Sequence, residues 1–500
     1  MAIDGEGDIM VVLPFPIEVL AMSAAPKNPA PLWQWSAVEL SGAIRDARVS
    51  ASDAVSSVVE RIRAENGHLN AIVFDQTEAA KEQAASYDEI LKTDGPIGPL
   101  HGVPVAIKIN VDQKGTANSN GVVAFKDVIA PEDAPVVRNL KKAGAIIVGR
   151  TNTPEFSFRA TTVNELHGRT YNPWDDNHSP GGSSGGASSA VAAGFCPIAH
   201  GNDIGGSLRF PAYQTGAVTV RPTLGRVPAY NPSGKEERSL LAQLMSVQGI
   251  IAREVRDVRL ATKVMAGYDA RDPMQVPLPF EGPAVEQPIK VALCRETNGY
   301  SMHPAIDAAL EKTAEQLEKA GYRVEEAAPP MIREAAAEAL PALYADCEIF
   351  IGEVIKKYGS AEIQKAFDFY FENYPPTDAE GLLRAMSRRT RYLREWNVFL
   401  EDYPLVLTPF MMRPGFTWNE DLESSAGTKD IFDSSVYSWL INFLGLPASI
   451  APADYHDGLP ISVQIIGRRF REDLTLDAAE ALERVNGVQI HELWKRKGLR

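Results

Sequence analysis

Cysteine and histidine are scarce in the sequence, and neither is arranged as a metal site or a disulfide framework. The three cysteines, Cys196, Cys294 and Cys347, are an odd number, lie far apart and form no CxxC pair. None of the eight histidines belongs to an HExxH pattern or another close ligand spacing. We therefore expect no metal, no cofactor and no disulfide, and we expect a reducing compartment, the cytoplasm.

Basic charge and long apolar runs are also in short supply. The 50 Lys and Arg residues are outnumbered by 65 Asp and Glu, and the net charge of −15 argues against a nucleic-acid partner. The apolar segment Ile9–Met22 is too short to span a bilayer and is interrupted by two prolines and Glu18. Acidic residues precede it, where a signal peptide needs positive charge. We interpret residues 1–30 as an N-terminal arm and expect no membrane partner.

Strand and helix patterns alternate along the 500 residues. Helical patterns cover residues 133–143 and most of 334–400, whereas strand patterns cover residues 101–111, 145–149, 403–409, 446–452 and 461–467. This rhythm is typical of a sheet covered by helices. We predict one large α/β domain over residues 31–500, with a central mixed β-sheet, helices on both faces and a mainly helical peripheral part around residues 300–400.

Two helices are predicted at the start of this domain. Ser36 and Glu39 form a capping-box pattern before the first. In the second, Val55, Val58 and Ile62 have the spacing of one apolar helix face.

Lys108 lies in an apolar strand pattern, residues 101–111, in which β-branched residues alternate with smaller ones. One interpretation is a lysine at the end of an edge strand that extends to water. The other is a desolvated lysine, whose pKa is lowered by burial so that its neutral amine can act as a base near neutral pH. The spacing alone leaves both open.

Residues 179–211 contain two glycine-rich loops joined by an apolar stretch. Because glycine permits unusual backbone angles and close approach to a ligand, we expect the loops to form the walls of one site. The first loop contains a GxSxG string, Gly181–Gly185, which in an α/β-hydrolase marks the nucleophilic serine, but no hydrophobic strand precedes it. Neither GxxxxGK[ST] nor a dinucleotide fingerprint is present, so a phosphate-binding loop is not indicated.

The second loop, Asn202–Ser207, has the composition of an anion-binding turn. Backbone N–H groups around its Gly-Gly pair can converge on one point, with the Ser207 hydroxyl beside them. An acyl-transfer nucleophile needs such donors because the oxyanion forms among them. A tight turn capped by Ser207 is the alternative.

Together these segments resemble the amidase signature family, in particular its stand-alone bacterial aryl and aliphatic amidases. The matching pieces are GVPVAIK (102–108), SPGGSSGGASSAVAAG (179–194), GNDIGGSLRFPA (201–212), RPTLGRVP (221–228) and GLPISVQIIG (458–467). The similarity extends over most of the chain. The resemblance implies hydrolysis of a carboxylic amide to an acid and an amine or ammonia, without a cofactor.

The resemblance assigns a Ser–cis-Ser–Lys triad residue by residue. Ser207 matches the nucleophile that carries the acyl group, Ser183 the bridging serine with a cis peptide bond from Gly182, and Lys108 the general base. Neutral Lys108 would take the Ser207 proton through Ser183 and return it to the leaving amine, which departs only when protonated. We therefore expect activity to rise as pH rises through the lysine pKa.

The resemblance also implies residues around the triad, namely the oxyanion-hole backbone of Ile204, Gly205 and Gly206, with Ser207, and the supporting residues Ser184, Asp203 and Arg209. Two positions depart from the family pattern. Asn202 replaces a common threonine, and Asn110 follows the lysine where aspartate is common. We expect neither to touch the triad, although Asn110 can change the hydrogen bonding around Lys108.

The substrate is predicted only as a small-molecule amide with an aryl or aliphatic acyl group, and esters and carbamates (urethanes) are alternatives. Aromatic residues and methionines in 334–400 and in the segment 410–418 (FMMRPGFTW) either line an acyl pocket or belong to the core. A non-catalytic binding protein, a histidine-dependent hydrolase and one subunit of a glutamine-dependent amidotransferase stay open as other functions. A homodimer is a further expectation.

Overall fold

An eleven-stranded sheet runs through the protein, whose computed structural model describes residues 30–500. The predicted N-terminal arm thus lies almost wholly outside the described residues. Across the sheet the strands are β1 (Ile72–Asp75), β3 (Ile146–Thr151), β2 (Pro104–Lys108), β6 (Ile198–Asp203), β8 (Val247–Ala252), β7 (Val218–Arg221), β12 (Ala448–His456), β13 (Leu459–Gly467), β11 (Leu405–Pro409), β9 (Lys290–Leu293) and β10 (Arg323–Glu326). A small separate hairpin pairs β4 (Val163–Asn164) with β5 (Gly168–Arg169).

The sheet is mixed, as predicted. Strand β2 is parallel to both its neighbours, β3 and β6, whereas the strands from β6 through β8, β7, β12 and β13 to β11 pair antiparallel. Strands β11, β9 and β10 are again parallel. Because β2 is an interior strand, the interpretation of Lys108 as an edge-strand residue is wrong.

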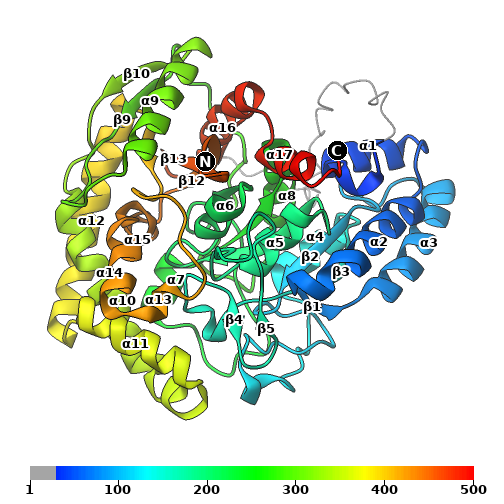
Figure 1. Cartoon of the computed structure of the whole chain (residues 1–500), viewed down its shortest axis with the longest axis horizontal. Coiled ribbons are helices and arrows are strands. Elements are labelled where there is room, and N and C mark those ends of the chain that lie inside the picture. The colour runs from blue at the N-terminus through cyan, green and yellow to red at the C-terminus, as the bar shows by residue number, and fades with distance from the viewer. Residues whose placement is uncertain (1–29) are drawn as a thin grey trace, which may run out of the picture.

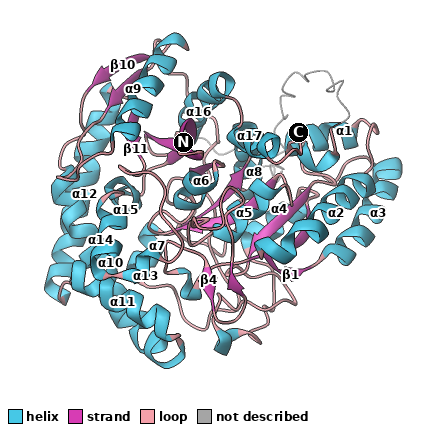
Figure 2. Ribbon diagram, in the orientation of Figure 1, coloured by secondary structure: helices cyan, strands magenta, loops and turns pink. Residues whose placement is uncertain are grey.

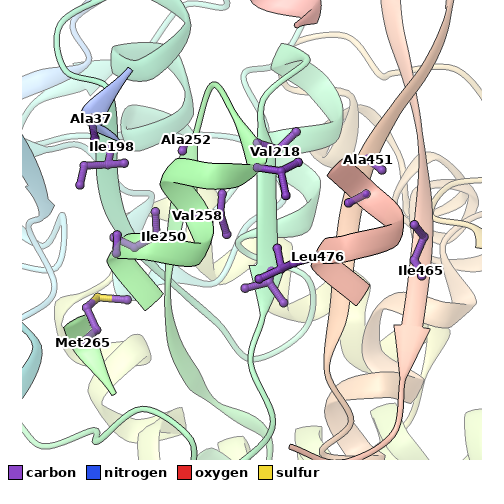
Figure 3. Close-up of a cluster of buried hydrophobic side chains, with 14 of the residues drawn as sticks. Ala37, Ile198, Val218, Ile250, Ala252, Val258, Met265, Ala451, Ile465 and Leu476 are labelled. Atoms are coloured by element: carbon purple, nitrogen blue, oxygen red, sulfur yellow. The ribbon is translucent and has the colours of Figure 1, made fainter. Parts of the chain in front are cut away.

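Helices cover both faces of the sheet, also as predicted (Figure 2). Alternate strand residues point to opposite faces, so that Val105 and Ile107 join one hydrophobic cluster and Ala106 another. The first face is covered by α1 (Ala37–Arg45), α4 (Pro135–Lys142), α8 (Val255–Met265), α9 (Pro304–Lys319) and α16 (Glu472–Asn486). Figure 3 shows part of this core, where Val258 of α8 and Leu476 of α16 lie against Ile250, Val218 and Ile465 of the strands.

The second face carries two groups of helices. One group packs on the half of the sheet near β2 and consists of α2 (Ala51–Leu69), α3 (Thr77–Asp94), α5 (Gly185–Ala193), α6 (Arg209–Thr215) and α17 (Gln489–Arg496). The other packs near β11 and includes α7 (Leu240–Met245), α10 (Ile332–Tyr358), α11 (Ala361–Asn373), α12 (Ala379–Asp402) and α15 (Val436–Leu444). The short helices α13 (Glu420–Glu423) and α14 (Ser425–Asp433) pack beside α11.

The helical excursion predicted around residues 300–400 corresponds mainly to α10, α11 and α12, which follow β10 and precede β11. In Figure 1 these helices lie at one end of the long axis, and α2 and α3 lie at the other. No helix in residues 30–500 is both long enough and apolar enough to cross a membrane.

The predicted helix starts are confirmed. Ser36 and Glu39 form a reciprocal capping box at the beginning of α1. The predicted apolar face of α2, with Val55, Val58 and Ile62, is buried.

Candidate active site

Lys108 ends strand β2 and is fully buried on the second face of the sheet. Its Nζ lies 2.7 Å from Ser183 Oγ, 3.1 Å from Ser184 Oγ and 2.8 Å from Asn202 Oδ1. Burial lowers the pKa of Lys108 well below its usual value, and the nearby charge of Asp203 opposes this only in part. The desolvated interpretation of Lys108 is therefore the correct one.

Ser183 stands in the loop that precedes α5, and the Gly182–Ser183 peptide bond is cis, as the resemblance predicts. The backbone packs so closely here that a side chain at Gly182 would meet the Arg159 carbonyl oxygen at 2.3 Å, and Gly181 adopts a φ of 81°. Glycine is required at both positions for these reasons. The residues before Ser183 form no strand, so the α/β-hydrolase interpretation of the GxSxG string is wrong.

Ser207 follows β6 in the turn that leads to α6, and it is half-buried. The two glycine-rich loops meet here, because the Ser184 N–H donates to the Ser207 carbonyl oxygen at 3.3 Å. Ser207 and Gly182 both line one pocket. The expectation that the loops form the walls of one site is thus confirmed.

The backbone donors of this turn are not equally free. The Gly206 N–H donates to Asp203 Oδ1 at 2.8 Å, so it is already occupied. Within the described part of the chain, the N–H groups of Ile204, Gly205 and Ser207 make no hydrogen bond. These three residues line the pocket and Gly206 does not. The predicted oxyanion hole therefore needs one correction: its available donors belong to Ile204, Gly205 and Ser207.

A buried ion pair holds the turn in place. Arg209 Nε lies 3.0 Å from Asp203 Oδ2, and both side chains are fully buried. Arg209 also donates to the Ser438 carbonyl oxygen at 2.8 Å and to Gln464 Oε1 at 2.9 Å. Although burial alone would raise it, the Arg209 charge holds the pKa of Asp203 well below its usual range. The flanking pair inferred from the resemblance is therefore in contact.

Asn202 touches the triad, contrary to the sequence-based expectation. Its Oδ1 is a partner of Lys108 Nζ, and its Nδ2 donates to Asn110 Oδ1 at 2.9 Å. Asn110 Nδ2 in turn donates to Ser157 Oγ at 2.9 Å. The two departures from the family pattern thus form one chain of amides, and Asn110 holds the Asn202 oxygen toward the lysine.

An apolar pocket opens in front of Ser207, where the two helix groups of the second face meet. Its lining comprises Ser157, Phe158, Arg159, Ala160, Gly182, Ile204, Gly205, Ser207, Phe210, Leu340, Leu343, Tyr344, Tyr370 and Phe432. The helices of 334–400 thus contribute to the pocket, as predicted, through leucines and tyrosines. The segment 410–418 contributes nothing to this lining, and its buried residues, such as Phe410 and Met411, pack in the core.

Arg159 brings a charge to the pocket wall, but that charge is already paired. Its guanidinium donates to both carboxylate oxygens of Asp421, at 2.9 and 2.8 Å, and to Glu362 Oε2 at 3.1 Å. These contacts tie the loop before the hairpin β4–β5 to α11 and α13. Sequence reasoning did not identify Arg159, because its partners lie more than 200 residues further along the chain.

Histidines and cysteines take no part in this site. No histidine lines the pocket, and His200 on β6 is buried with its Nε2 2.9 Å from Gln248 Oε1. Burial lowers the pKa of His200 to about 3. All three cysteines are free and buried, and residues 30–500 contain no cluster of His, Cys, Asp and Glu suited to a metal ion. A histidine-dependent hydrolase is therefore not supported.

Comparison with known proteins agrees with this geometry. The family model described as Amidase matches residues 53–476. The chain is 47% identical over 466 residues to indoleacetamide hydrolase of Bradyrhizobium diazoefficiens, covering 93% of this chain and 89% of that protein. A second relative is a glutamyl-tRNA(Gln) amidotransferase polypeptide of Moorella thermoacetica, which is 32% identical over 486 residues, covering 90% and 96%.

Among solved structures, a bacterial aryl acylamidase of the amidase signature family has the same fold. The TM-score is 0.80 at 24% identity, and the match covers 93% of this chain and 99% of that one. The chain belongs to the amidase signature family. It is an enzyme that hydrolyses amides.

Proposed function

We propose that Ser207 attacks the amide carbonyl while Ser183 passes its proton to Lys108. The observation that carries this proposal is the buried amine of Lys108, 2.7 Å from Ser183 Oγ, beside a pocket that exposes Ser207. A lysine with a lowered pKa is neutral near pH 7 and can accept a proton. The free N–H groups of Ile204, Gly205 and Ser207 supply donors for the oxyanion.

The contacts of Lys108 define the direction of the relay. A neutral amine has two N–H donors and one lone pair. Asn202 Oδ1 can only accept, and the Ser184 hydroxyl donates to the Asn202 carbonyl oxygen at 3.3 Å. Both therefore accept from Lys108, which leaves its lone pair for the Ser183 O–H. Asn202 and Ser184 are thus positioning residues that aim the basic lone pair at the bridging serine.

The same relay serves both halves of the reaction. When the tetrahedral intermediate collapses, Lys108 returns its proton through Ser183 to the leaving nitrogen, and the C–N bond breaks to give ammonia or an amine and an acyl-enzyme on Ser207. Water then attacks the ester, loses its proton through the relay and releases the carboxylic acid, while Ser207 Oγ is protonated again. Esters of the same acyl group also fit this scheme, because an alkoxide leaves more readily than an amine.

An Asn202→Asp substitution tests the role of the amide oxygen. A carboxylate beside Lys108 favours the ammonium form and raises its pKa. Because the base acts when neutral, the acidic limb of the kcat/KM–pH profile is expected to move to higher pH by about 1 unit or more. Asn202→Ser, which keeps an uncharged oxygen, is the matched control and is expected to move the limb far less. An unshifted limb in Asn202→Asp contradicts the assignment.

We further propose a primary amide of an arylacetic acid as the substrate, with indole-3-acetamide as the leading example. The pocket in front of Ser207 is walled by Phe158, Phe210, Tyr344 and Phe432, which suit an aromatic acyl group. The 47% identity to indoleacetamide hydrolase supports the same choice. Glutamine, the amide expected for an amidotransferase, would place a charged amino acid in this apolar pocket, where the Arg159 charge is already paired.

A substrate panel distinguishes these candidates. Ammonia release from indole-3-acetamide, 1-naphthaleneacetamide and glutamine is measured on the purified chain. We expect kcat/KM to be at least about 100-fold higher for the arylacetamides than for glutamine, because burial of an unpaired polar group is costly. Faster release from glutamine would favour the amidotransferase function. Binding of all three without hydrolysis would favour a non-catalytic binding protein.

We also propose that the enzyme acts in the cytoplasm and forms a homodimer. The cytoplasmic location is supported by the three free cysteines, which suit a reducing compartment. Sedimentation of the purified chain tests the homodimer.

A further inference from the structure

The hydroxyl group of Tyr344 has no partner, although the residue is only 2% exposed. Neighbouring tyrosines are all paired: Tyr370 donates to the Phe158 carbonyl oxygen at 2.9 Å, Tyr374 to Asp433 Oδ1 at 2.8 Å and Tyr437 to the Glu296 carbonyl oxygen at 2.6 Å. The Tyr344 oxygen is also absent from the enclosed polar atoms that lack a partner. It therefore faces open space, and the open space beside Tyr344 is the pocket.

The ring of Tyr344 is held firmly in position. It stacks on Tyr370 with a centroid distance of 5.6 Å and an interplanar angle of 2°, and it packs against Phe371 and Tyr374 at 5.9 and 6.4 Å. Helix α10 supplies the backbone. A hydroxyl on a ring so confined is preorganised, because few rotamers are lost when a ligand binds to it.

Every other polar side chain of the lining is already engaged or belongs to the reaction. Ser157 Oγ donates to Asn120 and accepts from Asn110, Arg159 pairs with carboxylates, and Tyr370 is bound to Phe158. Ser207 is the proposed nucleophile. Tyr344 thus offers the one free side-chain polar group with which the described pocket lining can recognise the distal part of an acyl group.

We propose that the Tyr344 hydroxyl is a specificity-determining group that accepts a hydrogen bond from a ring N–H on the acyl group of the substrate. The inference rests on the proposed arylacetamide activity and deepens it, because it selects nitrogen heteroaromatic rings of the indole type over carbocyclic rings of equal size. An N–H buried against Phe210, Leu340 and Phe432 would otherwise lose its hydrogen bond to water. Burial also raises the pKa of Tyr344 well above its usual value, so the hydroxyl stays neutral.

The test compares indole-3-acetamide with 1-naphthaleneacetamide, which has a bicyclic ring without an N–H. In Tyr344→Phe, the ratio of kcat/KM for the indole amide to that for the naphthalene amide is expected to fall about tenfold, as for the loss of one buried hydrogen bond. Tyr370→Phe is the matched control: its hydroxyl is bound to Phe158, so this ratio is expected to stay within about twofold of the wild-type value.

Binding measurements separate this inference from the proposed function. In the Ser207→Ala background, calorimetry with the same two amides reports recognition without turnover. A tenfold loss of relative affinity for the indole amide on adding Tyr344→Phe supports the inference, even if the wild-type enzyme proves to hydrolyse another amide. An unchanged ratio in both the kinetic and the binding experiment, or an equal shift in Tyr370→Phe, overturns it.

Discussion

Replacing Lys108 with methionine is expected to lower kcat/KM for an arylacetamide by about 10³–10⁴-fold, the contribution of a well-placed general base. Methionine keeps an unbranched apolar chain of similar volume, so the buried space is filled while the amine is lost. The same substitution is expected to abolish the acidic limb of the pH profile. In the wild-type enzyme that limb reflects Lys108, whose pKa is lowered by burial, so activity rises as pH rises and the amine becomes neutral.

Lys114→Met is the matched control, because Lys114 is exposed and follows the same strand by a few residues. It is expected to retain wild-type activity and the wild-type pH profile. If Lys108→Met keeps more than a tenth of the activity, or if its acidic limb is unchanged, Lys108 is not the base.

Replacing Ser207 with alanine is expected to lower kcat by about 10⁵-fold or more, as the loss of a nucleophile does in serine hydrolases. Any remaining hydrolysis would come from substrate binding and the N–H groups of the turn, which the substitution leaves in place. Thermal unfolding is expected to change little, since the Ser207 side chain makes no hydrogen bond to the described residues and is half-buried.

Ser301→Ala, at an exposed serine outside the site, serves as the control for Ser207→Ala and should leave kcat unchanged. Ser183→Ala should lose activity almost as severely as Ser207→Ala, because the proton then has no route to Lys108. The double variant should be little worse than either single one, since groups that act as a unit are not additive. Full additivity would contradict a shared relay.

Much of the fold was predictable because periodicity reports burial directly. The strand containing Lys108, the capping box at Ser36 and the apolar face of α2 all follow from local patterns. Local patterns could not determine which neighbours β2 has. The edge and interior positions of Lys108 therefore stayed open until the sheet order placed β2 between β3 and β6.

The contact between Lys108 and Asn202 was missed for the same reason. The two residues are 94 positions apart in the chain, but parallel pairing of β2 with β6 brings the carboxyl ends of both strands to one edge. A resemblance transfers residues that match a family pattern, so it indicates nothing about a position that departs from it. The only available signal was the departure itself.

The acyl pocket was predictable only in outline. Residues of α10 that line the pocket and residues that pack in the core are equally buried, so hydrophobicity does not separate Tyr344 from Tyr392. Phe158 and Phe432 come from segments that carried no pattern of their own. Their role depends on where α11 and α14 pack against the loop before the hairpin.

The most direct test of the account is to identify the residue that becomes acylated. The enzyme is quenched with acid during turnover of an activated arylacetic ester, and its peptides are mapped by mass spectrometry. We predict an arylacetyl adduct on the peptide containing Ser207, absent from Ser207→Ala and accumulating far more slowly in Lys108→Met. An adduct on another residue, or the same adduct formed at the wild-type rate without Lys108, would contradict the proposed relay.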